Sequence, residues 1–351
     1  MKTIATMALK PGMVLAEDVL SYKNELLLSR NTTLDDIAIA KISRYSVMCV
    51  NIKEEADFAT THFEKIRVSE GFRRFEKSYG IYMAVYKKMI DKLVNEDAPI
   101  ETETLYQIYG EITGCAKTGE ILLDYLYNML PTEDTVTYTH AVNSALVAGV
   151  FATWLGLPQK DQFLLIQCGF LYDVGKFLLP PELIWKPNRL TDEEYKRVKS
   201  HTIYGYHIIK NHGLDENIIR ATLEHHERYN GTGYPKGLKD DEINFYARIM
   251  SIVDAYCAMT SARSYRKTLI PLQVVANFEE SSDKYSPILL KPILTHIANS
   301  QMGMTVRLSD GSTAEIILIN QLRLSRPLVK CGDNNLIDLA KRTDLSIEAV
   351  L

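Results

Sequence analysis

The chain is poor in the residues that mark a disulfide-stabilised protein or a cysteine-based zinc protein. It has 5 cysteines among 351 residues, and they are scattered with no Cys-x-x-Cys pair. Disulfide frameworks and structural zinc sites use paired or closely spaced cysteines. The sequence therefore argues against both architectures, and we expect a protein of a reducing compartment, the cytoplasm.

A long hydrophobic run and a basic excess are also missing. The longest apolar stretch, Ala145 to Leu157, is shorter than the roughly 20 residues of a membrane-spanning helix. The amino-terminal apolar run stops at Lys10 and Pro11, too early for a secretory signal. Lys and Arg number 40 against 44 Asp and Glu, a net charge of −4, whereas proteins that coat nucleic acid usually carry a basic excess. We expect a soluble protein that binds neither membrane nor nucleic-acid polymer.

What is present suits a globular protein of several parts. Hydrophobic residues make up 46% and charged residues 24%, which is ordinary globular usage. The length predicts more than one domain. From changes in pattern along the chain we expect a small α+β module, a helical connector, a principal helical domain and a β-hairpin appendage, at residues 1–57, 58–130, 131–298 and 299–351.

The flanking regions show familiar periodicities. In the amino-terminal module, which we interpret as a regulatory or packing unit, Met13–Val19 and Glu25–Leu28 suggest short strands. From Phe63 to about residue 95, aromatic and apolar residues recur every three to four positions, which predicts one long amphipathic helix or two in line that could dimerise. Thr104–Met129 predicts a helical pair. Three further elements are expected from their patterns: a helix at Leu34–Tyr45, a strand at Val47–Ile52 and a hairpin at Met304–Ile319.

The region 131–298 is expected to be all-α with one Gly/Pro-rich loop. Thr191 and Glu194 form a capping box, which predicts the start of a helix that carries His201. Two further helices and the loop between them are expected at Leu214–Glu227, Ile243–Thr260 and 230–235.

Histidines give a first indication of chemistry. A single histidine is more often a surface or packing residue than a ligand, and that interpretation fits the isolated ones. The adjacent pair His225-His226 is less common. Side chains next to each other on a helix diverge by about 100°, so both would not normally serve one ion equally. The pair could serve two neighbouring ions, or one ring could ligate while the other binds substrate.

Five motifs follow one another through this region. They are YTHAVNSALVAG with His140, LYDVGK with Asp173, KRVKSHTIYGYHII with His201, HHERYNGTGYPKGL from His225, and ARIMSIVDAYCAM with Asp254. The ordered series resembles the HD-GYP family, the subgroup of HD-domain metallohydrolases that degrade cyclic di-GMP. The resemblance covers about residues 135–270. It implies a mainly α fold, an HD-type helical bundle, with 131–298 as the catalytic domain.

The resemblance also implies a metal site. Carboxylate and imidazole ligands suit Fe, Mn or Zn, and we expect one or two divalent ions, Fe or Mn. Two neighbouring cations can stabilise the attacking and the leaving oxygen of a phosphodiester, and a metal-bound water ionises near neutral pH. Asp173 would bridge the ions. The implied ligands are His140, Asp173, His201, His225, His226 and Asp254.

Substrate contacts are carried over in the same way. Lys176 matches the family lysine that touches a substrate phosphate, although a solvated lysine at a helix end is the plainer alternative. Arg263 and Arg266 look like the arginines that read the other phosphate or a guanine edge, tasks that guanidinium groups suit. Tyr234 lies in the Gly-Tyr-Pro loop and would contact substrate. That loop could also bind a partner, a second copy or a diguanylate cyclase.

The largest departure from the family is Tyr172, which stands where the family has the histidine of its His-Asp pair. A phenol with an ordinary pKa of roughly 10 is a poor ligand near neutral pH. Tyr172 could bind ferric iron, leave the first metal position loosened or empty, hydrogen-bond to a metal-bound water, or only pack. Val136 replaces the glutamate that some members use for a third ion, so a trinuclear centre is not expected. Smaller departures are Asn230, Cys257 and Ser264.

Three functions follow from these observations. The leading hypothesis is a metal-dependent phosphodiesterase that hydrolyses cyclic di-GMP to linear pGpG and onward to GMP. The second, suggested by Tyr172, is a catalytically impaired sensor that binds cyclic di-GMP. A metal-free helical scaffold is the third, and it is disfavoured because burying several imidazoles without a role is costly.

Overall fold

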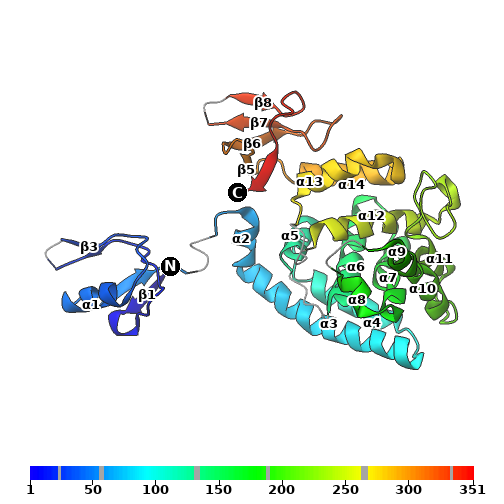
Figure 1. Cartoon of the computed structure of the whole chain (residues 1–351), viewed down its shortest axis with the longest axis horizontal. Coiled ribbons are helices and arrows are strands. Elements are labelled where there is room, and N and C mark those ends of the chain that lie inside the picture. The colour runs from blue at the N-terminus through cyan, green and yellow to red at the C-terminus, as the bar shows by residue number, and fades with distance from the viewer. Residues whose placement is uncertain (23–24, 55–58, 130–134, 187–189, 262–267, 333–334) are drawn as a thin grey trace. The chain divides into compact units, whose positions relative to one another are not determined.

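The protein is described from a computed structural model, which covers residues 1–351 except 23–24, 55–58, 130–134, 187–189, 262–267 and 333–334. Contacts along the chain divide it into two units, Met1–Glu70 and Gly71–Leu351 (Figure 1). Within the described residues, no helix combines the length and apolar character that crossing a membrane requires. The finer division into four domains stays a prediction.

The amino-terminal unit is a small α+β fold around its own apolar core. Strand β1 (Lys2–Ala5) pairs antiparallel with β4 (Cys49–Ile52), and β2 (Val19–Leu20) pairs with β3 (Leu26–Leu28). Helix α1 (Asp36–Arg44) starts where the side chain of Asp35 accepts a hydrogen bond from the Ala38 amide. The short helices η1 (Thr6–Ala8) and α2 (His62–Arg67) complete the unit.

Two expectations for this unit need correction. The strand predicted at Met13–Val19 is wrong over most of its length, because Val14 and Leu15 form only isolated bridges. The edge strand β1 was not anticipated, since most of its residues are exposed and its sequence lacks an alternating pattern. The predicted helix and the strand after it are confirmed as α1 and β4.

The larger unit is a helical bundle followed by a small sheet. Helix α6 is apolar on all sides and buried on all sides, as expected for the central helix of a bundle. Gly169 of α7 lets this neighbour approach closely, since a Cβ there would lie 2.4 Å from the Ala145 Cα. The α-helices are α3 (Glu70–Glu96), α4 (Thr102–Thr113), α5 (Gly119–Asn128), α6 (Val136–Trp154), α7 (Gln159–Leu171), α8 (Pro181–Trp185), α9 (Asp192–Lys199), α10 (His201–Ile209), α11 (Glu216–Glu224), α12 (Phe245–Thr260), α13 (Pro271–Glu280) and α14 (Pro287–Asn299).

The aromatic stripe of the long helix α3 is core. Phe75 contacts Tyr125 of α5 with ring centroids 5.1 Å apart, and the Tyr86 hydroxyl donates to the Phe170 carbonyl of α7 at 2.5 Å. Both side chains on α3 are fully buried. These aromatic residues of the stripe are therefore used within the chain, and dimerisation through this helix stays a prediction.

The helix that the capping box predicts begins as expected and ends early. Thr191 and Glu194 form the capping box of α9. That helix stops at Lys199, and His201 is the first residue of a separate helix, α10. The prediction that one helix carries both the box and His201 is therefore wrong, because a turn at Ser200 separates α9 from α10.

The carboxy-terminal part of the chain forms a five-stranded antiparallel sheet, in the order β8-β7-β6-β5-β9 (Figure 1). The predicted hairpin is present, with Gly311 at φ +84° in its turn and Val306 opposite Ala314. The strands beyond it were not predicted. The fold class, mainly α with a small α+β unit and a carboxy-terminal β element, is confirmed. Strands are β5 (Thr305–Leu308), β6 (Thr313–Leu318), β7 (Leu328–Cys331), β8 (Leu336–Asp338) and β9 (Ile347–Val350).

Candidate metal centre

Five segments of the bundle bring the candidate ligands together. Helix α6 carries His140, the end of α7 leads into Tyr172 and Asp173, α10 begins at His201, the turn after α11 carries the histidine doublet, and α12 carries Asp254. Their ligand atoms form two clusters that share Asp173. We call them the histidine group (Asp173, His201, His225, His226) and the carboxylate group (His140, Asp173, Asp254).

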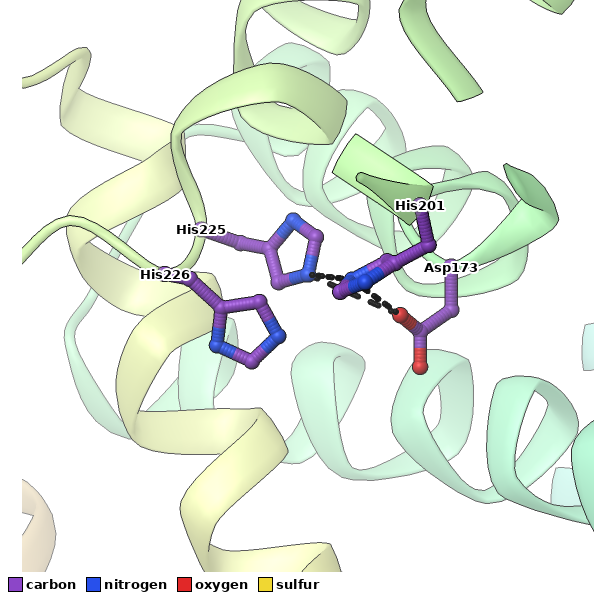
Figure 2. A group of neighbouring side chains, drawn as sticks. All are labelled: Asp173, His201, His225 and His226. Carbon is purple, nitrogen blue, oxygen red and sulfur yellow. Dashed lines mark hydrogen bonds and ion pairs between the residues drawn. The ribbon is translucent and has the colours of Figure 1, made fainter. Parts of the chain in front are cut away.

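The histidine group converges on one point (Figure 2). Nε2 of His201 and Nε2 of His225 are 3.2 Å apart. Oδ1 of Asp173 lies 3.3 Å from the first nitrogen and 3.5 Å from the second. All three side chains are essentially excluded from solvent.

The hydrogen positions on these rings follow from their other contacts. Nδ1 of His201 lies 2.6 Å from the Val198 carbonyl, and Nδ1 of His225 lies 2.9 Å from the Thr222 carbonyl. A carbonyl oxygen can only accept, so each Nδ1 carries the ring hydrogen and each Nε2 presents a lone pair. This arrangement fixes the tautomer as in many metal-ligating histidines.

Within the histidine group, Nε2 of His201, Nε2 of His225 and Oδ1 of Asp173 therefore offer three electron pairs with no hydrogen between them. Oδ1 of Asp173 is buried and accepts no hydrogen bond from the described residues. Burial lowers the pKa of His201, which keeps that ring neutral despite the nearby carboxylate. A divalent cation would satisfy both nitrogens and the oxygen together, and imidazole with carboxylate suits Fe, Mn or Zn. The residues present fit a metal ion.

The doublet lies directly after the end of α11, and both of its rings reach the same cluster. His225 is the residue that follows the last helical position, Glu224. The two rings lie with centroids 4.2 Å apart, and both belong to the histidine group. Burial, the largest influence, holds the pKa of His226 well below its ordinary value, so this ring is also neutral near pH 7.

The carboxylate group is arranged differently. Nε2 of His140 lies 3.0 Å from Oδ1 of Asp254 and 3.6 Å from Oδ2 of Asp173. The Tyr172 hydroxyl lies 2.7 Å from the same His140 nitrogen and 3.2 Å from Oδ1 of Asp254. Nζ of Lys176 donates to Oδ2 of Asp173 at 2.5 Å. Hydrogens are thus available at this group.

Both carboxylates are ionised near neutral pH. Burial by itself would raise the pKa of Asp173, but the Lys176 ammonium beside it holds that pKa well below its usual range. Burial opposes ionisation of Asp254 as well, and His140 with the charges around it lowers that pKa. By contrast, burial and the two carboxylates raise the pKa of the Tyr172 hydroxyl well above its ordinary value. The centre therefore combines two anions with a neutral phenol.

The Gly-Tyr-Pro loop is tied to the doublet. A Cβ on Gly233 would lie 2.4 Å from the Glu227 Cα, so the loop approaches the chain more closely than a side chain permits. The buried Glu227 carboxylate accepts hydrogen bonds from the amides of Lys236 at 2.7 Å and Leu238 at 3.0 Å. The Tyr234 ring then stacks on His226, with centroids 4.7 Å apart. Glu227 thus positions the loop.

Lys199 is a second cation near the centre, and the sequence interpretation missed it. Its ammonium lies 4.5 Å from the Tyr195 ring centroid and 4.9 Å from that of Tyr234. Such contacts hold a cation without neutralising it. Among the described residues, no carboxylate pairs with this lysine. Its position two residues before His201 was the available clue.

Arg263 and Arg266 lie outside the described residues, as does Ser264. Val136 begins α6 one turn before His140 and offers no ligand atom there. A third ion therefore receives no ligand from this position.

Comparisons with known proteins agree with this geometry. A family model described as HD domain matches residues 124–288. The cyclic di-GMP phosphodiesterase PA4108 of Pseudomonas aeruginosa is 30% identical over 202 residues, covering 57% of this chain and 49% of the relative. The cyclic di-GMP phosphodiesterase PdeB of Borreliella burgdorferi is 26% identical over 212 residues, covering 60% and 56%. The chain spans about half the length of these curated relatives.

A solved structure supports the fold. Bd1817, a HDG"Y"P protein from Bdellovibrio bacteriovorus, superimposes with a TM-score of 0.52 at 16% identity, covering 85% of this chain and 98% of that one. The helical bundle and the matched model define an HD domain. The ordered motifs of this region resemble the HD-GYP family, and the matched HD-domain model and the phosphodiesterase relatives support that resemblance.

Gly175 offers a test of how the centre is positioned. It lies in the short helix η4 (Val174–Leu178) just after Asp173, and a Cβ there would lie 1.9 Å from the His201 carbonyl oxygen. We expect Gly175→Ala to destabilise the fold by about 3 kcal/mol, the upper range for overpacking, and to weaken metal binding by separating Asp173 from His201. Urea unfolding and metal titration measure the two effects.

The control is Gly80→Ala on the exposed face of α3, where nothing lies within 4 Å of the added carbon. That variant should be as stable as the native chain or more stable by up to about 1 kcal/mol. Equal stability of the two variants would mean that the close approach at Gly175 is unimportant.

Proposed function

We propose that this protein is a metal-dependent phosphodiesterase that hydrolyses cyclic di-GMP to linear pGpG and onward to GMP. The observation that carries the proposal is the histidine group, where Oδ1 of Asp173 and the Nε2 lone pairs of His201 and His225 face one another, because each Nδ1 carries its ring hydrogen. The curated relatives are named as cyclic di-GMP phosphodiesterases, which supports the same substrate. Fe(II) and Mn(II) are the proposed ions.

The bound ion would polarise a phosphate oxygen and supply hydroxide near neutral pH. Lys176 binds the scissile phosphate from the side of Asp173 and offsets charge that accumulates in the transition state. Lys199 and Tyr234 line the same side of the doublet and bind the nucleotide beyond it. Hydrolysis breaks the P–O3′ bond, the water oxygen stays on phosphorus as the new 5′-phosphate, and a proton goes to the 3′ oxygen.

The test uses purified protein with Fe(II) or Mn(II) under reducing, anaerobic conditions. Chromatography should show cyclic di-GMP converted to pGpG, and then more slowly to GMP. Parallel reactions with 3′3′-cGAMP measure base preference, because other relatives are named as phosphodiesterases specific for that dinucleotide. Absence of turnover with either metal and either substrate would overturn the proposal.

Lys176 provides a specific prediction for this reaction. We expect Lys176→Ala to lower kcat/KM by about a hundredfold, as loss of a single charge-stabilising donor does elsewhere, because its ammonium lies at the shared carboxylate. Steady-state kinetics at fixed metal measure the change. Lys87→Ala is the matched control, since that lysine pairs with Asp91 on α3. Equal losses in the two variants would contradict a direct role for Lys176.

Tyr172 favours a second function, a cyclic di-GMP sensor with impaired catalysis. The phenol stands in contact with His140 and Asp254, where the family has an imidazole. Calorimetry would support this alternative if the dinucleotide binds tightly and is recovered intact. A second copy or a diguanylate cyclase as a partner of the Gly233-Tyr234-Pro235 loop, and a cytoplasmic location, stay predictions.

A further inference from the structure

We propose that the Tyr172 side chain takes the place of an ion in the carboxylate group, so that each chain binds one divalent ion, held by the histidine group. The two clusters share Asp173 and contain similar ligand types. They differ in whether their nitrogen and oxygen acceptors already have hydrogen-bond donors.

In the carboxylate group the acceptors have donors. The Tyr172 hydroxyl lies 2.7 Å from Nε2 of His140 and 3.2 Å from Oδ1 of Asp254. Its oxygen is also 3.0 Å from the Ser144 hydroxyl. Lys176 donates to Oδ2, the Asp173 oxygen that is nearer to His140. Together with the 3.0 Å contact between Nε2 of His140 and Oδ1 of Asp254, the phenol and the ammonium satisfy this group without a metal ion.

In the histidine group, Nε2 of His201, Nε2 of His225 and Oδ1 of Asp173 have no such donor. Both ring hydrogens are committed to the carbonyls of Val198 and Thr222, and Oδ1 of Asp173 accepts no hydrogen bond from the described residues. Lone pairs about 3 Å apart repel one another unless a cation lies among them. A metal ion is therefore needed at Oδ1 of Asp173, in the histidine group.

The length of the Tyr172 side chain leads to the same assignment. A phenol oxygen stands further from its main chain than either nitrogen of an imidazole does. In place of histidine, tyrosine therefore puts its oxygen into the volume that a histidine-bound ion would fill. The ring is fully buried and meets the His225 ring edge to face at 4.7 Å, so its surroundings oppose a swing away from the cluster.

The first experiment counts ions. Native protein is reconstituted anaerobically with Mn(II), freed of excess ion by gel filtration and analysed by mass spectrometry of the metal. We expect one ion per chain in the native protein and two in Tyr172→His. Tyr79→Phe is the control for loss of a buried phenol, because Tyr79 contacts Asn143 outside both groups, and it should keep one ion. Two ions in the native chain, or none, would overturn the proposal.

Single-ligand variants locate the ion. His140 belongs to the carboxylate group alone and His201 to the histidine group alone. His140→Ala should therefore keep one ion, whereas His201→Ala should lose it. The reverse pattern would overturn the assignment. Circular dichroism confirms that each variant is folded, and this pair of variants keeps the proposal testable even if Tyr172→His does not fold.

A spectroscopic measurement addresses the role of the phenol directly. Protein loaded with Fe(II) and then oxidised should show no visible tyrosinate-to-iron charge-transfer band, because the Tyr172 oxygen binds no ion. A band that is present in the native protein and lost in Tyr172→Phe would mean that Tyr172 is a ligand. These readouts do not depend on turnover: one ion with hydrolysis would leave the proposed activity intact, and one ion with intact dinucleotide would favour the sensor.

Discussion

Asp173→Asn is expected to abolish phosphodiester hydrolysis and to remove the bound metal. The asparagine keeps the size of the side chain but removes the negative charge, and one of its two terminal atoms becomes an amide nitrogen that cannot ligate. Oδ1 of Asp173 lies 3.3 and 3.5 Å from the two imidazole nitrogens of the histidine group. Losing the central anion should weaken metal binding by about a hundredfold or more.

Activity should fall further than affinity. The same carboxylate holds Lys176 through Oδ2, so the variant also frees the cation that would face the phosphate. We expect kcat/KM for cyclic di-GMP to drop by about a thousandfold, roughly 4 kcal/mol of transition-state stabilisation. Calorimetry with Mn(II) and steady-state kinetics measure the two losses separately.

Asp161→Asn is a matched control, because this carboxylate accepts a hydrogen bond from the Tyr246 hydroxyl at 2.9 Å and belongs to neither group. It should bind metal and turn over substrate as the native chain does. Native-like metal affinity in Asp173→Asn would show that the shared position of Asp173 has no role in holding the ion.

The sequence predicted which residues cluster because each candidate ligand lies within a short, recognisable motif. HHERYNGTGYP and the His-bearing helices carry the ligand types in order. It could not predict which oxygen of Asp173 serves which cluster, because that depends on how α7, α10 and α11 cross. The crossing is set by close approach at Gly175 and Gly205, each of which would place a Cβ within 3 Å of another segment.

The sequence also could not predict the individual contacts of Glu227 and Tyr172, because these depend on how the chain folds. Glu227 reads as a polar residue beside the doublet, and only the folded loop shows its carboxylate accepting two backbone amides. Fewer of the roles left open for the Tyr172 side chain remain once its contacts with Ser144, His140 and Asp254 are known. The last three strands of the terminal sheet have only three or four residues each, too few to show a clear periodicity.

Acid should destabilise the metal-free protein while the carboxylates of the centre are still ionised. Burial lowers the pKa of both His201 and His226 below the ordinary 6.5. The unfolded chain therefore takes up protons at these rings over a pH range in which the folded chain does not. Stability linked to them is fully present above about pH 6.5 and is lost as the pH falls toward the lowered values in the fold.

Each such proton changes the free energy of unfolding by about 1.4 kcal/mol per pH unit, so the two rings together should contribute up to about 2.7 kcal/mol per unit. The carboxylates affect stability at a lower pH. Because the fold lowers the pKa values of Asp173 and Asp254, the stability linked to them is lost only below their ordinary pKa of 3.8. Urea unfolding with a chelator present, repeated from about pH 7.5 to about pH 5, measures the slope.

Histidine variants assign that slope to the centre. His201→Gln combined with His226→Gln should flatten it, because the unfolded chain then has no extra proton to bind at these positions. His207→Gln changes an exposed histidine of the same helix as His201 and should leave the slope unchanged. A slope that persists in the double variant would place the acid sensitivity outside the metal centre. It would also mean that these two rings are not held neutral by burial.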